Sequence, residues 1–296
     1  MQVKSNGLDF EVEINEPGRP DGAPTVLLIM GLGMQLVAWP LEFVKALTDA
    51  GYRVVRLDNR DIGLSYKTTA KVPNLVWMGL KFRLGFAVRT DYTLRDMVED
   101  TRGVLDALNI TRCHVIGVSM GGMIAQGLAS HHPDRVLSLT SIMSTTGARG
   151  LPQATPAATM ALLKRPKSRK REDIVEHFVK VLTVIGSPKY PMNEAELRQR
   201  IGEAYDRSFY PAGTIKQMGA IMASGDRSDE VRKITVPTLV IHGKDDPLVP
   251  LKHGEDTAKK IAGSEYTEID GMGHDLGVLP VLMERIVPFL RAHTPV

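Results

Sequence analysis

The sequence predicts an α/β fold in which a mostly parallel sheet carries helices on both faces. Two observations predict this fold. Short, nearly continuous runs of apolar and β-branched residues recur along the chain, as they do in buried parallel strands. Segments with the 3.6-residue periodicity of amphipathic helices lie between these runs. Where strands and helices alternate in this way, each helix connects two parallel strands and covers the sheet between them.

Seven segments are expected to be strands. The first alternates apolar and polar residues, which is typical of a half-buried antiparallel strand, and the others are more continuously apolar. In chain order they span residues 10–14, 25–30, 52–58, 113–118, 136–143, 237–242 and 265–270.

Four helices are expected between or after these strands, on the basis of their apolar periodicity. Thr93 is expected to cap the second helix, Gly51 follows the end of the first, and Pro288 is expected to kink the last. The four segments span residues 39–50, 93–108, 120–130 and 279–293.

Residues 147–232 interrupt the alternation. They contain six prolines and no convincing strand, but they show helical periodicity at 172–184, 193–206 and 213–223. We therefore expect a helical cap at 147–232, inserted between two strands of a core that comprises residues 1–146 and 233–296. Such a division fits the chain length of 296 residues, which allows one large α/β domain with an insertion.

The charge balance argues against a nucleic-acid-binding protein. The chain has 37 basic and 34 acidic residues, a net charge of +3, and six of the basic residues lie in the single run 164–171. Without that run the acidic residues outnumber the basic ones, so the positive charge is not spread over a whole face. We interpret the run as a solvated loop or helix edge within the cap.

Several other classes of protein are excluded. The only cysteine, Cys113, cannot form an intrachain disulfide, and no cluster of residues has the spacing of a metal site. The first ten residues lack an apolar signal core, and the longest clean apolar stretch, 26–30, is too short to span a bilayer. We expect a soluble, cytoplasmic protein without stable membrane insertion, cofactor or metal; a homo-oligomer is left open.

The segment Gly117-Val-Ser-Met-Gly121 is the clearest candidate for a chemical site. An apolar strand precedes it and a helix rich in small residues follows it, which is the setting that a nucleophilic serine on a strained turn requires. The glycines leave room for the strand and the helix that pack against the turn. Ser119 is therefore expected to stand at the carboxyl edge of the sheet, where sites of parallel sheets form.

A serine hydroxyl needs a base and an orienting carboxylate. Among eight histidines, His274 lies in a glycine-rich loop directly after the last strand, at the same sheet edge as Ser119. The loop after the preceding strand offers Asp245 and Asp246. We favour Asp246, because Pro247 restricts it to an extended or turn conformation that suits a fixed carboxylate.

The negative oxygen of a tetrahedral intermediate needs backbone N–H donors. One is expected from Met120, at the amino end of the helix that follows Ser119. The other is expected from Leu32, because Gly31 and Gly33 allow the turn after the early apolar strand to come close.

These motifs together resemble those of the α/β-hydrolases, over nearly the whole chain, and are most similar to bacterial esterases of the aclacinomycin-methylesterase-like branch. Further segments that carry the resemblance are Asp58-Asn-Arg-Asp-Ile-Gly-Leu-Ser65 and Pro237-Thr-Leu-Val-Ile-His-Gly-Lys-Asp-Asp-Pro247. The resemblance implies an eight-stranded sheet and supports Asp246 as the acid. Two departures are Met30-Gly31, where many relatives have His-Gly, and Asp61, where Arg-Gly-x-Gly is more common.

The predicted activity is hydrolysis of a carboxylic ester, in a small-molecule substrate, through an acyl-enzyme, with Ser119, Asp246 and His274 as the triad. The same triad serves thioesterases, lipid-ester hydrolases, and cofactor-free haloperoxidases or perhydrolases, and the sequence does not separate these. Dehalogenase or epoxide-hydrolase chemistry is disfavoured, because it needs a carboxylate nucleophile at position 119, where this chain has a serine. A non-catalytic binding module is disfavoured, because such a module would not need a complete triad. The apolar segment 72–88 is either a wall of the substrate pocket or ordinary packing against the cap.

Overall fold

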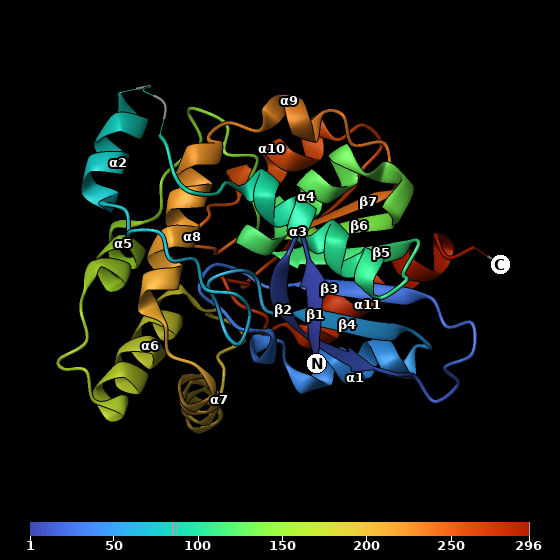
Figure 1. The fold of residues 1–296 in the computed structure, drawn as a ribbon, viewed down its shortest axis with the longest axis horizontal. Helices are drawn as coiled ribbons and strands as arrows, with labels where there is room; N and C mark the ends of the chain where they lie inside the picture. Colours follow the sequence, from blue (N-terminus) through green and yellow to red (C-terminus); the bar gives the residue numbers. More distant parts are fainter. Residues whose placement is uncertain (85, 87, 296) are drawn as a thin grey trace.

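The structure is a computed structural model that describes residues 1–84, 86 and 88–295. One eight-stranded sheet, in the order β1-β2-β4-β3-β5-β6-β7-β8, runs through it (Figure 1). The strands β1, β2 and β4 pair antiparallel, and every pair from β4 to β8 is parallel. The predicted α/β fold with a mostly parallel eight-stranded sheet is thus confirmed. The strands are β1 (Gln2–Ser5), β2 (Leu8–Asn15), β3 (Thr25–Ile29), β4 (Arg53–Leu57), β5 (Cys113–Val118), β6 (Val136–Ile142), β7 (Thr238–Gly243) and β8 (Glu265–Ile269).

The first strand was missing from the sequence-based expectation. It is an edge strand of four residues that pairs with β2 through the turn at Asn6 and Gly7. Both turn residues have positive φ, 50° and 77°, which a two-residue hairpin turn requires. The Asn-Gly pair is the signal from which this hairpin could have been predicted.

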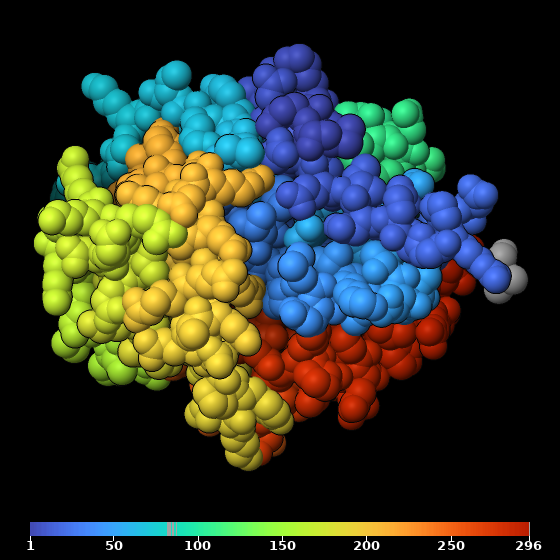
Figure 2. All heavy atoms as spheres, turned by 90° about the horizontal axis from the view of Figure 1, so that it is seen from below, coloured from blue at the N-terminus to red at the C-terminus, as the bar shows by residue number. Residues whose placement is uncertain are grey.

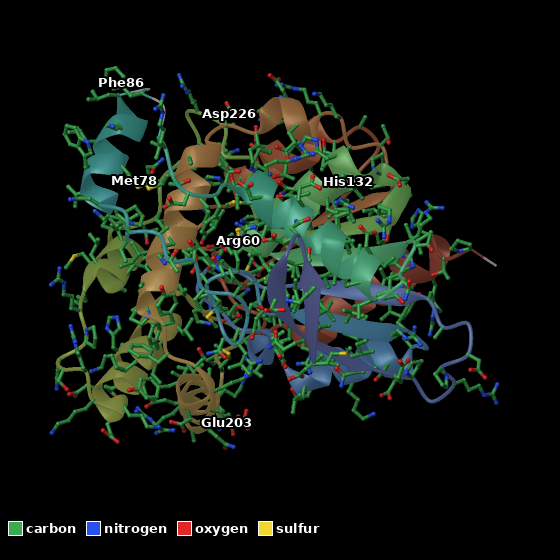
Figure 3. All side chains as sticks on the ribbon, viewed as in Figure 1. Arg60, Met78, Phe86, His132, Glu203 and Asp226 are labelled. Carbon is green, nitrogen blue, oxygen red and sulfur yellow. The ribbon has the colours of Figure 1, made fainter. Side chains whose placement is uncertain are left out.

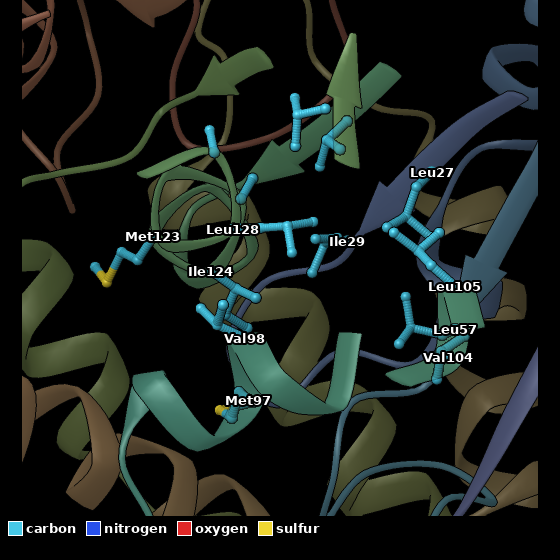
Figure 4. Packing of buried hydrophobic residues seen from close by; sticks show 14 of the residues in the cluster. Leu27, Ile29, Leu57, Met97, Val98, Val104, Leu105, Met123, Ile124 and Leu128 are labelled. Carbon is cyan, nitrogen blue, oxygen red and sulfur yellow. The ribbon is translucent and has the colours of Figure 1, made fainter. Parts of the chain in front are cut away.

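Helices cover both faces of the sheet, since alternate residues of the buried strands point to opposite sides. On β3, Leu27 and Ile29 pack against α3 (Leu94–Ala107) and α4 (Met120–His131), as Figure 4 shows for this cluster. The intervening residues Val26 and Leu28 belong to the cluster that contains α1 (Leu41–Asp49) and α11 (Leu279–Ala292).

The predicted helix starts and ends agree with the structure within a few residues. Thr93 caps α3 in a reciprocal capping box with Asp96. The last helix, α11, contains Pro288 and continues past it to Ala292, close to the predicted end at residue 293.

Five helices lie between β6 and β7, in the region where a helical insertion was expected. The helices α6 and α7 pack on each other through a small apolar cluster, and α6 and α5 also adjoin (Figures 1 and 2). The five are α5 (Pro156–Leu163), α6 (Arg171–Ile185), α7 (Glu194–Arg207), α8 (Pro211–Ser224) and α9 (Ser228–Val231).

Six short elements were not predicted from the sequence. They are the helices α5, α9, α2 (Leu75–Arg83) and α10 (Lys252–Lys260), and the single-turn 3₁₀ segments Leu36–Ala38 and Pro133–Arg135. In α5, Thr155 caps the helix and Pro156 occupies its first position, which are recognisable start signals. No helix among the described residues combines the length and the apolar content needed to cross a bilayer.

Candidate active site

Ser119 occupies the sharp turn between β5 and α4. Its backbone has φ 54° and ψ −121°, a region that residues with a side chain rarely adopt. The turn is held by the Ser119 N–H, which donates to the carbonyl of Ile142 at 2.9 Å, and by the Ser144 hydroxyl, which donates to the Ser119 carbonyl at 2.8 Å. Such strain persists only where the surroundings fix it, and it is common at functional sites.

The glycines of the motif allow this turn to form. A Cβ on Gly117 would overlap the backbone of Gly121, and a Cβ on Gly121 would overlap the carbonyl oxygen of Ile29 in β3. Neither obstacle is the end of a flexible side chain, so neither can move aside. The two glycines are therefore required by the close approach of β3, β5 and α4 at this point.

His274 and Asp246 meet Ser119 at the carboxyl edge of the sheet. His274 Nε2 lies 3.0 Å from Ser119 Oγ, and His274 Nδ1 lies 2.7 Å from Asp246 Oδ2. The Asp246 side chain is fully buried and that of His274 is only 8% exposed. The second carboxylate oxygen of Asp246, Oδ1, accepts hydrogen bonds from the N–H groups of Leu248 and Val249, which fix the carboxylate in place.

The neighbouring Asp245 points elsewhere. Its Oδ2 accepts the N–H of Gly271, at the base of the loop that carries His274. Asp245 thus fastens the histidine loop, whereas Asp246 contacts the imidazole itself. Of the two aspartates, Asp246 is therefore the one in hydrogen-bond contact with His274.

The turn after β3 runs alongside the serine, where the second oxyanion donor was expected. A Cβ on Gly31 would lie only 3.2 Å from the Ser119 Cβ, so the backbone of this turn passes directly beside the hydroxyl. Within the described part of the chain, the N–H groups of Leu32 and Met120 have no hydrogen-bond acceptor. Met120 is the first residue of α4, where an N–H has no partner inside the helix.

Gln217 of α8, which the sequence-based analysis did not identify, holds this turn from the other side. Its Oε1 accepts the N–H of Gly33 at 2.9 Å, and its Nε2 donates to the carbonyl of Arg60 at 2.8 Å. The side chain is fully buried, and Gly33 has φ 70°. Because 184 residues separate Gly33 from Gln217, no local sequence pattern could have indicated the contact.

A second unanticipated contact fastens the histidine loop to the segment after α6. The carboxylate of Asp275 accepts both the N–H and the hydroxyl of Ser187, and the N–H of His274 donates to the carbonyl of Ile185 at 2.7 Å. Gly273 has backbone so close to Gly186 that a Cβ would overlap it. The base and the turn beside the serine are therefore both held by residues from the region between β6 and β7.

Asp61, which stands where the pattern Arg-Gly-x-Gly would have a glycine, also has a structural explanation. Its φ is 66°, a conformation that glycine adopts freely and that aspartate tolerates better than most residues. Burial raises the pKa of Asp61, although the N–H of Thr68 and the ammonium of Lys216, at 3.7 Å, oppose that effect. Lys216 belongs to α8, so the aspartate adds an ionic contact that a glycine cannot make.

Cys113 lies within β5 and is fully buried. Burial raises the pKa of its thiol to about 12, so the thiolate that a nucleophile needs is not available. This agrees with its interpretation as a small apolar core residue.

The family of this chain follows from comparison with known proteins. The sequence profile described as alpha/beta hydrolase fold matches residues 24–279, which is most of the chain. The chain belongs to the alpha/beta hydrolase fold family. The prediction that it is a hydrolase of this family is thereby confirmed.

Curated relatives align with it over most of their length. It is similar to the rhodomycin D methylesterase DauP of Streptomyces sp. (strain C5), with 29% identity over 94% of this chain and 92% of the relative. It is also 28% identical to a 2-hydroxy-6-oxononadienedioate/2-hydroxy-6-oxononatrienedioate hydrolase of Paraburkholderia phymatum, over 93% and 88% of the two chains. Among solved structures, the enol-lactonase of Burkholderia xenovorans LB400 superimposes with a TM-score of 0.74 at 24% identity, covering 98% of this chain and all of the other.

Proposed function

We propose that this α/β hydrolase is a serine carboxylesterase. The observation that carries the proposal is the continuous hydrogen-bond chain from Asp246 through His274 to Ser119, at 2.7 and 3.0 Å. These are the distances and the order that transfer of a proton from a hydroxyl to an imidazole requires. The strained backbone of Ser119 supports the same role.

In the first half of the reaction, Ser119 Oγ attacks the ester carbonyl carbon while its proton passes to His274 Nε2. Asp246 holds the Nδ1–H tautomer and stabilises the imidazolium that forms. The negative oxygen accepts hydrogen bonds from the N–H groups of Leu32 and Met120, each typically worth about 3 kcal/mol in the transition state. The C–O bond then breaks, and the imidazolium gives its proton to the leaving alcohol.

In the second half, water attacks the acyl-enzyme. His274 takes a proton from the water, and the same two N–H groups bind the second tetrahedral intermediate. When that intermediate collapses, the Ser119 oxygen leaves and recovers the proton from His274. The net reaction consumes one ester and one water and releases one carboxylic acid and one alcohol, so it needs no oxidant or reductant.

The relatives support an ester as the substrate. DauP and DnrP, both described as rhodomycin D methylesterases, are 28–29% identical to this chain over 94% of its length. A methyl ester contains a small alcohol. We therefore propose esters of small alcohols as the substrate class.

Cleavage of a carbon–carbon bond is the second candidate. Six similar relatives, 27–29% identical, are described as hydrolases of 2-hydroxy-6-oxononadienedioate or its triene counterpart. Their substrate is a vinylogous diketo acid with two carboxylates. We prefer the ester because the methylesterases match a larger share of both chains.

We propose that residues 147–232 act as a cap over the core formed by 1–146 and 233–296. The support is that Gln217 fastens the turn at Gly33 and that Ser187 fastens the loop at Asp275. A cap fixed to both loops would shape the substrate site and keep the donors and the base in position.

The proposed function can be tested with purified protein and paired substrates. Methyl, ethyl and benzyl esters of short and long acids should be hydrolysed by the wild type and not by Ser119→Ala. Matched thioesters, a ring-fission product of the dienedioate type, and peracid formation with hydrogen peroxide are assayed beside them. Preferred turnover of methyl esters supports the proposal, whereas turnover of the diketo acid without ester hydrolysis would replace it by the second candidate.

A further inference from the structure

Two helices at one end of the molecule expose large apolar side chains to solvent. On α2, Val76 is 85% and Trp77 57% exposed, and on α5, Met160 is 60% and Leu163 76% exposed. Both helices lie at the end opposite the C-terminus, and Phe86, also exposed, lies beyond the outer end of α2 (Figures 1 and 3). A helix that is apolar all round, as α5 is, is normally buried.

The opposite face of α2 is packed conventionally. Met78 is buried, and its methyl group lies close to Gly219 of α8. The exposed residues Val76, Trp77 and Leu80 therefore share the other side of the helix, facing away from the protein. Their exposure is not the result of an unpacked helix, because the helix has its own buried contact.

The segments that carry these apolar side chains contain no acidic residue. Residues 70–90 and 151–171 together hold ten basic residues, although the chain as a whole has nearly as many acidic as basic ones. The basic residues are Lys71, Lys81, Arg83, Arg89, Lys164, Arg165, Lys167, Arg169, Lys170 and Arg171. Acidic residues follow directly at Asp91 and Glu172, and Arg171 pairs with Asp206, but the segments themselves carry an excess of positive charge. Exposed apolar and aromatic residues beside clustered positive charge are typical of surfaces that adsorb to anionic membranes.

A pocket of about 390 Å³ lies beside α2, and two basic side chains line it, as the binding of an anionic headgroup would require. It is bounded by Trp77, Lys81 and Arg89, together with Pro73, Asn74, Met78 and Val88. The Lys81 ammonium lies 5.7 Å from the centre of the Trp77 ring. Among the residues that the structure describes, neither Lys81 nor Arg89 has a carboxylate within ion-pair distance.

We propose that α2 and α5 dock this end of the protein on the surface of an anionic lipid bilayer. The side chains of Val76, Trp77, Met160 and Leu163 would enter the headgroup region, and the basic residues would bind lipid phosphates. This is adsorption to one face of the membrane, without a spanning segment. A second copy of the chain is a poorer occupant, because it would bring the positively charged segments 70–90 and 151–171 of two chains together.

Trp77 provides a direct readout, since the only other tryptophan, Trp39, is fully buried. The full-length protein is mixed at low salt with vesicles of phosphatidylglycerol and phosphatidylcholine, or of phosphatidylcholine alone. The proposal predicts co-sedimentation and a blue shift of tryptophan emission with the anionic vesicles. It also predicts release by 0.5 M salt and at least tenfold weaker binding to the neutral vesicles.

Two variants separate the apolar and the charged contributions. The apolar contribution is tested by the double variant Trp77→Asp/Leu163→Asp. The charged contribution is tested by the triple variant Lys167→Gln/Arg169→Gln/Lys170→Gln. Each variant should weaken binding to anionic vesicles on the order of tenfold or more. The matched controls are Leu41→Asp, an exposed leucine on α1, and Lys4→Gln/Lys45→Gln/Lys252→Gln, which removes three charges from other elements. All variants should keep the wild-type turnover of a soluble ester.

Several results would overturn the proposal. One is the absence of binding to anionic vesicles at low salt, and another is an equal loss of binding in the control variants. A third is a concentration-dependent dimer in which Trp77 is shielded from a soluble quencher, since a second copy would then be the occupant. Because ester turnover is measured separately, failure of the lipid proposal would leave the proposed function unaffected.

Discussion

At the residue scale, the roles of the two adjacent aspartates can be separated by the same substitution. Asp246→Asn should lower kcat by about 10⁴, because the amide favours the wrong imidazole tautomer. Asp245→Asn should have a small effect, since an asparagine oxygen can still accept the Gly271 N–H. The measurement is kcat on one methyl ester for both variants. A larger loss in Asp245→Asn would mean that the acid has been assigned to the wrong residue.

Gln217 is expected to act as a positioning residue for the turn that carries Leu32. Gln217→Leu removes the acceptor of the Gly33 N–H and the donor to the Arg60 carbonyl, so the turn loses its support. We expect kcat to fall roughly 10- to 100-fold while KM changes little, because an oxyanion donor acts mainly in the transition state.

The control for that prediction is Gln199→Leu, an exposed glutamine on α7. It should leave both kinetic constants unchanged. A Gln217→Leu enzyme that loses affinity for substrate but keeps kcat would indicate a pocket residue instead of a support for the oxyanion turn.

At the element scale, a buried histidine in β5 makes the stability of the sheet depend on pH. His114 Nδ1 lies 2.7 Å from Ser138 Oγ of β6, and its Nε2 lies 3.0 Å from Thr294 Oγ1, just after α11. Burial, with a smaller contribution from His293, lowers the pKa of His114 from 6.5 to about 4. The unfolded chain therefore binds a proton in this pH range that the folded chain does not.

The free energy of unfolding should be greatest above about pH 6.5 and should fall as the pH is lowered towards 4, on the order of 3 kcal/mol from this group. His114→Gln removes the titration and should flatten the curve in that window. Burial also lowers the pKa of His242, so some dependence should remain. Urea unfolding at pH 7, 6, 5 and 4 measures the slope. Parallel curves for wild type and variant would contradict the prediction.

The elements of the core follow from local patterns, and for that reason most of them could be predicted. Buried strands such as 113–118 are continuous apolar runs, and α3 has both a cap and a periodic apolar face. The strand β1 and the helix α10 were missed because one is short and half exposed and the other is largely polar. In such elements tertiary contacts, and not local periodicity, determine the structure.

The candidate triad was predictable for a topological reason. In a parallel sheet the loops after successive strands meet at one edge, so Ser119, Asp246 and His274 could be placed together from their positions alone. The residues that hold this site, such as Gln217 and Ser187, could not be found in that way. They approach it from a different part of the fold, and their residue types are common in any helix or loop.

At the scale of the whole molecule, a buried ion pair joins α7 to the loop after β4. Arg207 Nη1 lies 2.7 Å from Asp58 Oδ2, and the Asp58 side chain is fully buried. Among the residues that the structure describes, Arg207→Met would leave that carboxylate with two backbone donors, from Leu36 and Leu64. We expect a loss of roughly 3 kcal/mol in the free energy of unfolding.

The control is Arg171→Met, which breaks an Arg–Asp pair of the same length on the surface of α6 and α7. Because both partners of that pair are exposed, its loss should change stability little. Thermal and urea unfolding of the two variants provide the comparison. Equal losses would show that the contact between α7 and the core is not a principal support of the fold.

Whether Ser119 is the nucleophile of an esterase is tested most directly by looking for an acyl group on its oxygen. The protein is mixed with a methyl ester, quenched in acid within milliseconds, and analysed by intact mass and peptide mapping; a fluorophosphonate probe is used in parallel. We expect one acyl or phosphonyl group per chain, on Ser119, and none in Ser119→Ala or, at matched times, in His274→Ala. Ester hydrolysis that continues in Ser119→Ala, or a group attached to another residue, would contradict it.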